Sequence, residues 1–243
     1  MSASHWTAAW QAARRALTLA AFCAGGLLAT SAPAQAQGQT AEGPPRVALE
    51  TNLGTIVIEL APEHAPKTVA NFLRYVNDGH YNGTIFHRVI PNFMAQAGGF
   101  DAQMREKPTR PPVEHEGRQA MQAGLRNQVG TIAMARTNDP QSATAQFFIN
   151  VANNDFLDPV LIPPGDPVPE FVHRGRTYRN VPRAQLLNSP QLFGYTVFGR
   201  VVSGMDVVQR LVQIPTGSGG PFPTDVPKQT VTILKASVQK GRT

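Results

Sequence analysis

The sequence predicts a mainly β protein with one antiparallel sheet that is either closed or sandwiched. Three observations support this prediction. Many short runs alternate apolar and polar residues between turn-forming residues, only two segments have the apolar spacing of a helix, and strands and helices do not alternate as in a parallel sheet. A chain of 243 residues, 42% of them hydrophobic and 16% charged, suits one globular domain or at most two small ones.

Residues 1–36 predict an export signal. Arg14 and Arg15 end a positively charged start, an apolar stretch follows from Ala16 to Thr30, and Ala34-Gln35-Ala36 has the small-x-small pattern of a cleavage site. The apolar stretch is too short for an ordinary membrane-spanning helix. We therefore expect a periplasmic protein without stable membrane insertion after cleavage.

Two alternatives to a cleaved signal stay open. A retained anchor helix is disfavoured by Gly25-Gly26, and lipid attachment at Cys23 is disfavoured by the bulky Phe22 before it. Cleavage would leave a chain without cysteine, which needs no disulfide in an oxidising compartment. Residues 37–45 then form a polar linker containing Pro and Gly, and the predicted domain covers residues 46–240.

The charge distribution argues against a nucleic-acid partner. The chain has 22 Lys and Arg against 16 Asp and Glu, a net charge of +6. Only Arg14 and Arg15 of these charged residues precede position 37, so the mature part carries +4. Its cationic residues are scattered rather than gathered into a patch, so we expect no nucleic-acid binding.

The first ordered elements are a hairpin and a helix. Apolar residues alternate with polar ones on both sides of Asn52-Leu53-Gly54, which predicts two strands joined by a turn. Helical spacing then predicts a helix over about 66–78, with Pro66 near its start and Gly79 just past its end. The apolar residues with that spacing are Val69, Phe72, Leu73 and Val76.

Short strands and one more helix are predicted along the rest of the chain. Asp206–Val212 is the second predicted helix, and residues 100–128 and 159–193 show no regular pattern. The second of these irregular stretches contains seven prolines and a basic cluster. The predicted strands are Thr84–Ile90, Phe93–Ala97, Thr131–Ala135, Gln146–Val151, Thr196–Val201 and about Thr230–Val238.

Residues 86–99 bring a charged side chain near an amide and apolar neighbours. Two strands are joined by a tight turn, and strand alternation places Met94 and Gln96 on one face within reach of Arg88. Phe93 has the opposite parity and joins this face only if the pleat is broken near the turn. Such a surface suits a peptide carbonyl beside a hydrophobic ring. The alternative is an Arg paired with a carboxylate and a Gln that satisfies a loop.

Residues 134–150 form a second segment of interest. Gln146 and Phe148 share a strand face, whereas Phe147 points to the opposite face. The small polar run 137–145 predicts a surface loop. The two phenylalanines also suit a core on both sides of a sheet.

Both segments resemble the central signatures of the cyclophilin family. FHRVIPNFMAQAGG (86–99) and MARTNDPQSATAQFFIN (134–150) carry the resemblance, and NFLRYVNDGHYNGTIFHRVI, NNDFLD and FGYTVFGRVVSGMDVV extend it to about residues 46–158 and 194–238. Within the family, these sequence segments are most similar to those of the bacterial periplasmic branch. The resemblance implies a closed eight-stranded antiparallel β-barrel capped by two α-helices. It also implies a peptidyl-prolyl cis-trans isomerase that acts in the folding of exported proteins, without metal or cofactor.

The resemblance also implies roles for particular residues. Arg88 matches the catalytic arginine. The pocket for the substrate proline corresponds to Phe93, Met94, Phe148 and Leu157, and the residues that contact the substrate backbone correspond to Gln96 and Gln146. The segment beside the residue before proline corresponds to Ala135, Arg136 and Thr137.

Three positions depart from other branches of the family. Phe156 stands where many eukaryotic members have tryptophan, and the loss of the indole N–H implies weak binding of cyclosporin at most. Tyr195 stands where those members have a groove histidine, but its ring can still form a wall of the pocket. Arg136 replaces a small amide, so contacts there differ. His87 has the opposite parity to Arg88, and we interpret it as structural.

The Pro-rich insertion at about 159–193 falls between two groove positions, Leu157 and Tyr195. It is therefore either a surface loop or a lid or docking arm beside the site. The expected partners are unfolded or proline-containing polypeptides, and we expect a monomer. A noncatalytic chaperone of the same fold and a solute-binding protein of another fold are the alternatives. The intact Arg88 disfavours the first, and the two signatures disfavour the second.

Overall fold

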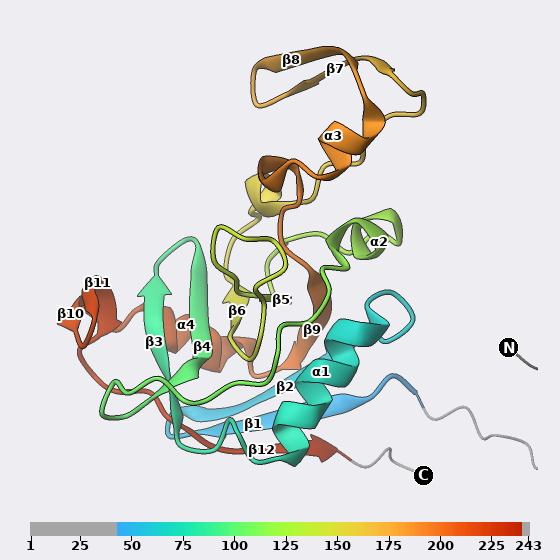
Figure 1. Cartoon of the computed structure of the whole chain (residues 1–243). Coiled ribbons are helices and arrows are strands. Elements are labelled where there is room, and N and C mark those ends of the chain that lie inside the picture. Colours follow the sequence, from blue (N-terminus) through green and yellow to red (C-terminus); the bar gives the residue numbers. More distant parts are fainter. Residues whose placement is uncertain (1–42, 240–243) are drawn as a thin grey trace, which may run out of the picture. The chain divides into compact units, whose positions relative to one another are not determined.

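The computed structural model describes residues 43–239, so the predicted export signal and most of the linker lie outside the described residues. Eight strands in this range form one antiparallel sheet in the order β12-β1-β2-β9-β5-β6-β4-β3 (Figure 1). Every predicted strand is present, with small shifts at the ends. The bounds are β1 Arg46–Thr51, β2 Gly54–Leu60, β3 Thr84–Ile90, β4 Met94–Asp101, β5 Thr131–Met134, β6 Phe147–Asn150, β9 Val197–Ser203 and β12 Ile233–Gln239.

The sheet is curled but open, which corrects the expectation of a closed barrel. Its edge strands β3 and β12 approach each other at a bridge between Ile85 and Thr232. The amides of Gly83 and Phe86 also donate to carbonyls of the facing segment at 2.8 and 2.9 Å. These contacts do not continue as a ladder within residues 43–239. The register of β3 against β4 is irregular around Phe86, and such irregularities bend a strand and disrupt pairing.

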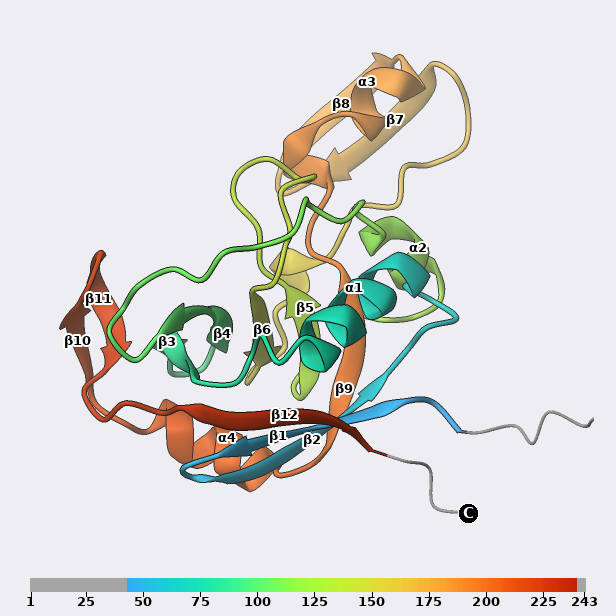
Figure 2. The same ribbon diagram turned by 60° about the horizontal axis from the view of Figure 1, so that its bottom comes forward.

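The two predicted helices are α1 (Pro66–Asn77) and α4 (Met205–Val212). Helix α1 packs against β12, and α4 packs against β2, β3 and β4 (Figure 2). Two further short helices, α2 (Gly117–Gln122) and α3 (Arg183–Leu187), were not predicted. Six and five residues are too few to show a helical period, so the two-helix expectation was incomplete.

The interior of the curled sheet holds an aromatic core. Phe72 of α1 packs against Tyr81, Phe147 and Phe198, with ring centroids 5.1–5.6 Å apart. All four rings are fully buried. The Tyr81 hydroxyl donates to the Ala145 carbonyl at 2.9 Å, which satisfies its one polar atom. Phe147 therefore belongs to the core, whereas its neighbour Phe148 is on the other face.

The N-terminus of α1 is satisfied by a distant carboxylate. Ala65 precedes the helix and offers no side-chain cap. Glu116, just before α2, instead accepts the backbone N–H groups of Lys67 and Thr68 at 3.0 and 2.8 Å, and the Thr68 hydroxyl at 2.7 Å. The negative charge also complements the helix dipole. This contact ties residues 114–122 to the main sheet.

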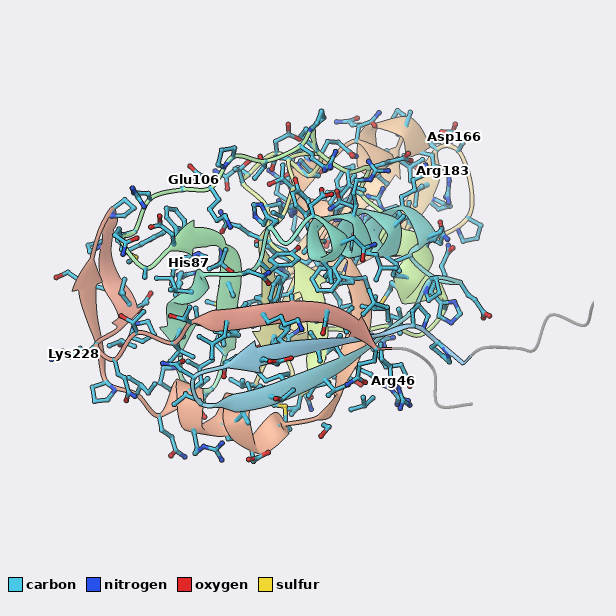
Figure 3. All side chains as sticks on the ribbon, turned by 90° about the horizontal axis from the view of Figure 1, so that it is seen from below. Arg46, His87, Glu106, Asp166, Arg183 and Lys228 are labelled. Atoms are coloured by element: carbon cyan, nitrogen blue, oxygen red, sulfur yellow. The ribbon has the colours of Figure 1, made fainter. Side chains whose placement is uncertain are left out.

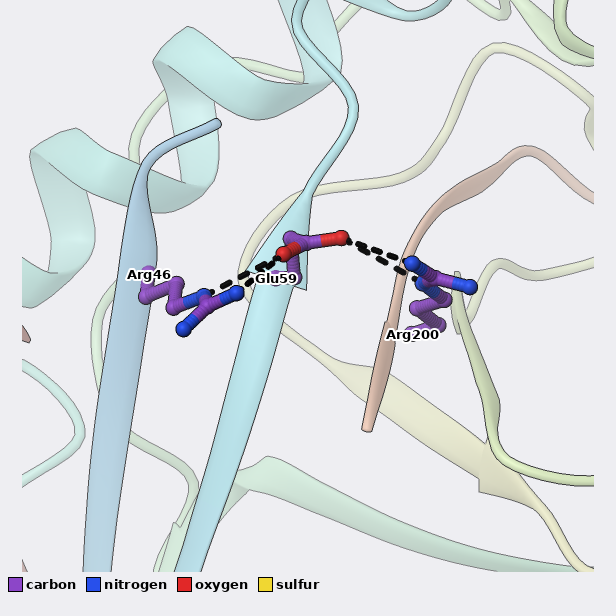
Figure 4. Close-up of polar contacts among 3 residues, drawn as sticks. All are labelled: Arg46, Glu59 and Arg200. Atoms are coloured by element: carbon purple, nitrogen blue, oxygen red, sulfur yellow. Dashed lines mark hydrogen bonds and ion pairs between the residues drawn. The ribbon is translucent and has the colours of Figure 1, made fainter. Parts of the chain in front are cut away.

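One carboxylate links three neighbouring strands on the sheet surface. Glu59 on β2 accepts from Arg46 on β1 at 2.7 Å and from Arg200 on β9 at 3.0 Å (Figure 4). Hydrogen bonds from Arg46 and then Arg200 lower the pKa of Glu59. The carboxylate therefore stays ionised at neutral pH and favours the observed strand order.

Residues 159–193 fold into a small unit, although the sequence was interpreted as irregular there. Strands β7 (Val168–His173) and β8 (Arg176–Val181) form a hairpin, followed by α3 and a 3₁₀ turn, η2 (Pro190–Leu192). The N–H of Arg183 donates to Asp166 at 2.9 Å, which ties the start of α3 to the loop before β7 (Figure 3). The unit has its own small core of Ile162, Val168, Leu186 and Leu192.

A last hairpin lies beside β3. It consists of β10 (Thr216–Gly219) and β11 (Phe222–Pro227), and β11 contacts β3 (Figure 1). The sequence analysis predicted no element in this segment, which is rich in Gly and Pro. Its Phe222 packs onto the His87 ring of β3, with centroids 5.4 Å apart.

Within residues 43–239, no helix is long and apolar enough to cross a membrane.

Candidate active site

A hollow of about 100 Å³ with an apolar floor opens on the face of the sheet away from the aromatic core. Its floor is a cluster of buried residues separate from the aromatic core. Four strands, β4, β5, β6 and β9, each supply one member, and Leu157 completes the floor. The strand residues are Met94, Ala133, Phe148 and Val197. The residues that line the hollow are Arg88, Phe93, Met94, Gln96, Ala135, Arg136, Phe148, Leu157 and Tyr195.

Strand register explains how three lining residues meet. Gln96 on β4 stands opposite both Arg88 on β3 and Phe148 on β6. Side chains of directly opposed residues lie on the same face of a sheet. The predicted grouping of Arg88, Met94 and Gln96 on one face agrees with this arrangement.

Phe93 reaches the hollow because it precedes β4, so the alternation of side chains along that strand does not apply to it. Residues 91–93 form the turn after β3, Asn92 has a φ of 59°, and the Phe93 N–H donates to the Ile90 carbonyl at 3.2 Å. Strand β4 starts only at Met94. The turn therefore frees Phe93 from strand parity, which is the condition that the sequence analysis named.

Arg88 lies at the edge of the hollow. Its side chain is 39% exposed, and its Nε is 3.5 Å from Oδ2 of Asp225 on β11. That distance exceeds the usual length of a charge-assisted hydrogen bond. Because a guanidinium has five N–H donors, Arg88 keeps donors for a ligand in the hollow.

Two glutamines form a polar side to the hollow. The Gln96 amide donates to the Gln146 side-chain oxygen at 2.9 Å, so one amide orients the other. Gln146 lies behind Gln96 and does not line the hollow itself. It packs against Gly99, where an added Cβ would be only 2.5 Å from the Gln146 amide carbon. Gly99 therefore makes room for this pair.

Arg136 and Tyr195 form the wall opposite the sheet edge. The Arg136 guanidinium lies over the Tyr195 ring, 4.6 Å from its centroid, and donates to the Gly194 carbonyl at 2.9 Å. The Tyr195 ring meets Phe148 edge to face, with centroids 5.5 Å apart. Arg136 is thus held by a carbonyl and an aromatic face, which fixes the position of the Tyr195 wall.

Phe156 lies at the rim and not in the lining. Its side chain is 55% exposed and stacks on Phe93, with centroids 5.6 Å apart. Its neighbour Leu157 is buried and belongs to the floor. The structure therefore brings all the predicted site residues into one neighbourhood, with Gln146 behind the hollow and Phe156 outside it. Sequence reasoning missed Asp225, which lies in a segment without a recognisable pattern.

His87 is turned away from the hollow, into the protein. It is fully buried against the rings of Phe100 and Phe222, and neither ring nitrogen has a hydrogen-bond partner within residues 43–239. Burial, aided by the charge of Arg88, lowers the pKa of His87 to about 4. The ring is therefore neutral at pH 7, in agreement with a structural role.

His87 should make the protein less stable in mild acid. The pKa of His87 is about 4 in the folded protein, against the ordinary value of 6.5 expected in the unfolded chain. Between these two pH values the unfolded chain binds a proton at this residue and the folded chain does not. The contribution of the neutral His87 to the free energy of unfolding is fully present above pH 6.5. It is lost as the pH falls towards 4, and the loss amounts to about 3 kcal/mol. Denaturant unfolding between pH 7 and 4 should show a smaller decrease for His87→Phe than for the wild type. Equal decreases would contradict the assignment.

A second hollow, of about 130 Å³, lies near the start of α1 and is lined by charged side chains. Its charges are already engaged. Lys67 pairs with Glu114, and Arg118 donates to backbone carbonyls of the insertion, including Leu187 at 2.9 Å. Glu116 accepts a backbone N–H from the first turn of α1. This hollow is therefore a junction between structural elements and not a second reaction site.

Comparisons with known proteins agree with these features. A family model described as cyclophilin type peptidyl-prolyl cis-trans isomerase/CLD matches residues 46–238. The chain is 47% identical over 192 residues to a peptidyl-prolyl cis-trans isomerase of Streptomyces antibioticus, covering 79% of this chain and 97% of that protein. It is 44% identical over 194 residues to peptidyl-prolyl cis-trans isomerase B of Escherichia coli, covering 80% and 99%.

A solved structure shows the same fold at lower identity. A crystal structure of a cyclophilin type peptidyl-prolyl cis-trans isomerase from Cryptosporidium parvum has a TM-score of 0.51 and 20% sequence identity, and covers 82% of this chain and 99% of that one. That protein was also crystallised in the presence of the dipeptide Ala-Pro, with a TM-score of 0.50, 21% identity and coverage of 80% and 99%.

Proposed function

The chain belongs to the cyclophilin type peptidyl-prolyl cis-trans isomerase family, and we propose that Arg88 and the hollow beside it accelerate rotation about X–Pro bonds in exported polypeptides. The observation that supports this proposal most directly is the partly exposed Arg88 guanidinium at the edge of that hollow.

The reaction requires stabilisation of a twisted amide, because no bond is made or broken. Resonance sets a barrier of about 20 kcal/mol to rotation, and uncatalysed exchange takes tens of seconds or longer. In the twisted state the imide nitrogen loses its resonance and gains a lone pair. A donor that hydrogen-bonds to that nitrogen favours the twisted state over both planar states.

Arg88 is the donor that this mechanism assigns. The proline ring would enter the hollow against Phe93, Met94, Phe148 and Leu157, which places its nitrogen near the sheet edge that carries Arg88. Apolar walls exclude water and strengthen the hydrogen bond. The ring is held on one side of the rotating bond by these walls.

Polar groups hold the other side of the rotating bond. Gln96, oriented by Gln146, faces the hollow beside Arg88 and can bind a substrate carbonyl. Ala135 and Arg136 line the opposite wall, where the residue that precedes proline would lie. Rotation then occurs between two fixed ends.

NMR exchange spectroscopy of a short Ala-Pro peptide tests this function. Substoichiometric protein should produce exchange cross-peaks between the cis and trans forms, which exchange too slowly to give them alone. Absence of such cross-peaks at saturating peptide would reject the proposed activity. It would favour a module that only binds polypeptides.

We also propose export to the periplasm, on the basis of residues 1–36 alone. Expression of the full chain in a Gram-negative host, followed by fractionation and N-terminal sequencing, tests this location. The expected product is periplasmic and begins at Gln37. A cytoplasmic product that retains Met1 would contradict the proposal.

Weak cyclosporin binding is proposed because of Phe156. Its ring is exposed at the rim and has no N–H to donate, unlike the tryptophan of many eukaryotic members of the family. Cyclosporin should therefore inhibit the Phe156→Trp variant more strongly than it inhibits the wild type. Equal inhibition of the two proteins would show that this position does not control binding.

A further inference from the structure

We propose that the turn of the β7–β8 hairpin, together with Phe156, forms a docking surface for an acidic segment of the polypeptide whose proline occupies the hollow. This inference rests on the proposed function and extends it to the substrate chain outside the proline. The surface, here called the arginine rim, consists of Phe156, Arg174 and Arg176.

The insertion begins and ends at the hollow. Leu157 in the floor precedes it and Tyr195 in the wall follows it, and the Tyr195 N–H donates to the Leu157 carbonyl at 2.9 Å. The closed base of the insertion is therefore part of the site wall. Chain that leaves the hollow on this side meets the insertion first.

The base of the insertion is held by α2. Arg118 donates to the carbonyls of Val160 and Leu187 at 3.2 and 2.9 Å, and its guanidinium lies over the Phe193 ring at 4.6 Å. Together with the separate core of the insertion, these contacts give it a defined position. A positioned element suits docking better than a mobile loop does.

The tip of the hairpin returns to the rim of the site. Arg174, in the turn, donates to the Phe156 carbonyl. Phe156 in turn stacks on Phe93, which lines the hollow. A continuous path therefore runs from the proline pocket over an exposed ring to the hairpin turn. Val172, beside the turn, adds an apolar side chain that is 62% exposed.

Charge identifies the partner as acidic. Within residues 43–239, every ion pair is made by other cationic residues, so no carboxylate lies within ion-pair distance of Arg174 or Arg176. Arg176 lies over the Tyr178 ring, 5.2 Å from its centroid, so its charge is placed but not neutralised. Guanidinium groups with unused donors bind carboxylates with two parallel hydrogen bonds. Asp or Glu beside the proline segment therefore fits this surface.

The test compares two peptides on one protein. Both have the same Ala-Pro centre, and one has Glu and the other Gln on either side. In low salt the wild type should show a KM about three- to fivefold lower for the Glu peptide, and salt at about 1 M should remove the difference. Equal KM values for the two peptides in low salt would overturn the inference.

Variants show whether the hairpin carries the effect. Arg174 has a φ of 49°, so Arg174→Asn removes the charge with a residue that tolerates this backbone, and Arg176→Gln completes the double variant. The matched control is Arg74→Gln with Lys235→Gln, which removes two charges from exposed sites on α1 and β12. The hairpin variant should lose the preference for Glu and the control should keep it. Equal loss in both would assign the effect to net charge and overturn the proposal.

This outcome is separable from failure of the proposed function. If the Gln peptide is turned over but the Glu peptide shows no preference, only the docking inference fails. If neither peptide shows catalysed exchange, the proposed function itself fails. Preference for a Lys-flanked peptide would also overturn the acidic assignment.

A separate observation identifies Asp225 as a positioning residue for Arg88. Its carboxylate is 3.5 Å from the Arg88 Nε and comes from a different element, β11. Asp225 has a φ of 69°, a conformation that non-glycine residues rarely adopt. Phe222 of the same strand packs on His87, the neighbour of Arg88. We infer that this hairpin holds the carboxylate behind the guanidinium and directs its other donors to the hollow.

Asp225→Asn tests this role without changing the backbone requirement, because Asn also tolerates positive φ. We expect kcat to fall about two- to fivefold with KM little changed. Asp206→Asn is the matched control, because it breaks another Asp–Arg pair at 2.7 Å on α4. An unchanged kcat in Asp225→Asn, or an equal fall in Asp206→Asn, would overturn the assignment.

Discussion

Replacement of Arg88 by alanine should lower kcat/KM for an X–Pro peptide by about a hundredfold or more, while the protein remains folded. Loss of one preorganised donor to a transition state typically costs this much, about 3 kcal/mol. The fold should tolerate the change because the side chain is 39% exposed and its ion pair with Asp225 is long. The measurement is catalysed cis-trans exchange by NMR, with thermal unfolding to verify the fold.

Two further variants sharpen this prediction. Arg88→Lys should also be poor, since a point charge lacks the planar fork of donors. Arg200→Ala removes an exposed arginine that pairs with Glu59 away from the hollow, and it should retain activity. If Arg88→Ala exchanged peptide as fast as the wild type, the mechanism would be wrong.

The elements that the sequence predicted well are those that bury a continuous apolar face. Helix α1 shows its period over twelve residues, and β1–β2 and β3–β4 alternate around recognisable turns. The curl of the sheet could not be derived in the same way. Whether edge strands meet in a ladder depends on accumulated twist and on irregular register near Phe86, and neither leaves a residue pattern.

The sequence of the insertion does contain a local signal for its hairpin. Arg174-Gly175 separates two runs with partly alternating apolar residues, and both residues have positive φ, as in the two-residue turns of hairpins. The prolines obscured this pattern. Pro167 and Pro182 flank the strands, and Pro169 lies in a strand of a two-stranded sheet, where a missing N–H is tolerated.

The candidate site was predictable as a set of residues but not as a geometry. The motif around residues 86–99 identified Arg88 and Gln96, and strand parity grouped them correctly. Parity failed to decide Phe93, because the turn conformation at Asn92 determines where that ring lies. Asp225 lies more than a hundred residues away in sequence, so only the three-dimensional arrangement brings it to Arg88.

A large loss of stability is expected from Gly204→Ala, at the junction of β9 and α4. Gly204 has a φ of 84°, which costs an alanine about 1–2 kcal/mol. A Cβ there would also overlap the Thr55 carbonyl oxygen and lie 2.9 Å from Cα of Ile56, both in β2. Backbone atoms of a paired strand cannot move aside cheaply, so overpacking adds about 1–3 kcal/mol.

Gly124→Ala separates these two costs. Gly124 has a φ of 89°, but a Cβ there would have no atom within 4 Å. Denaturant unfolding should therefore show a loss of about 1 kcal/mol for Gly124→Ala and about 4 kcal/mol for Gly204→Ala. Gly204→Asn tolerates the backbone but retains the Cβ, so its loss should lie between the two. Equal losses for Gly124→Ala and Gly204→Ala would mean that β2 yields to the added atom, and that the close approach of α4 to the sheet is not what requires glycine.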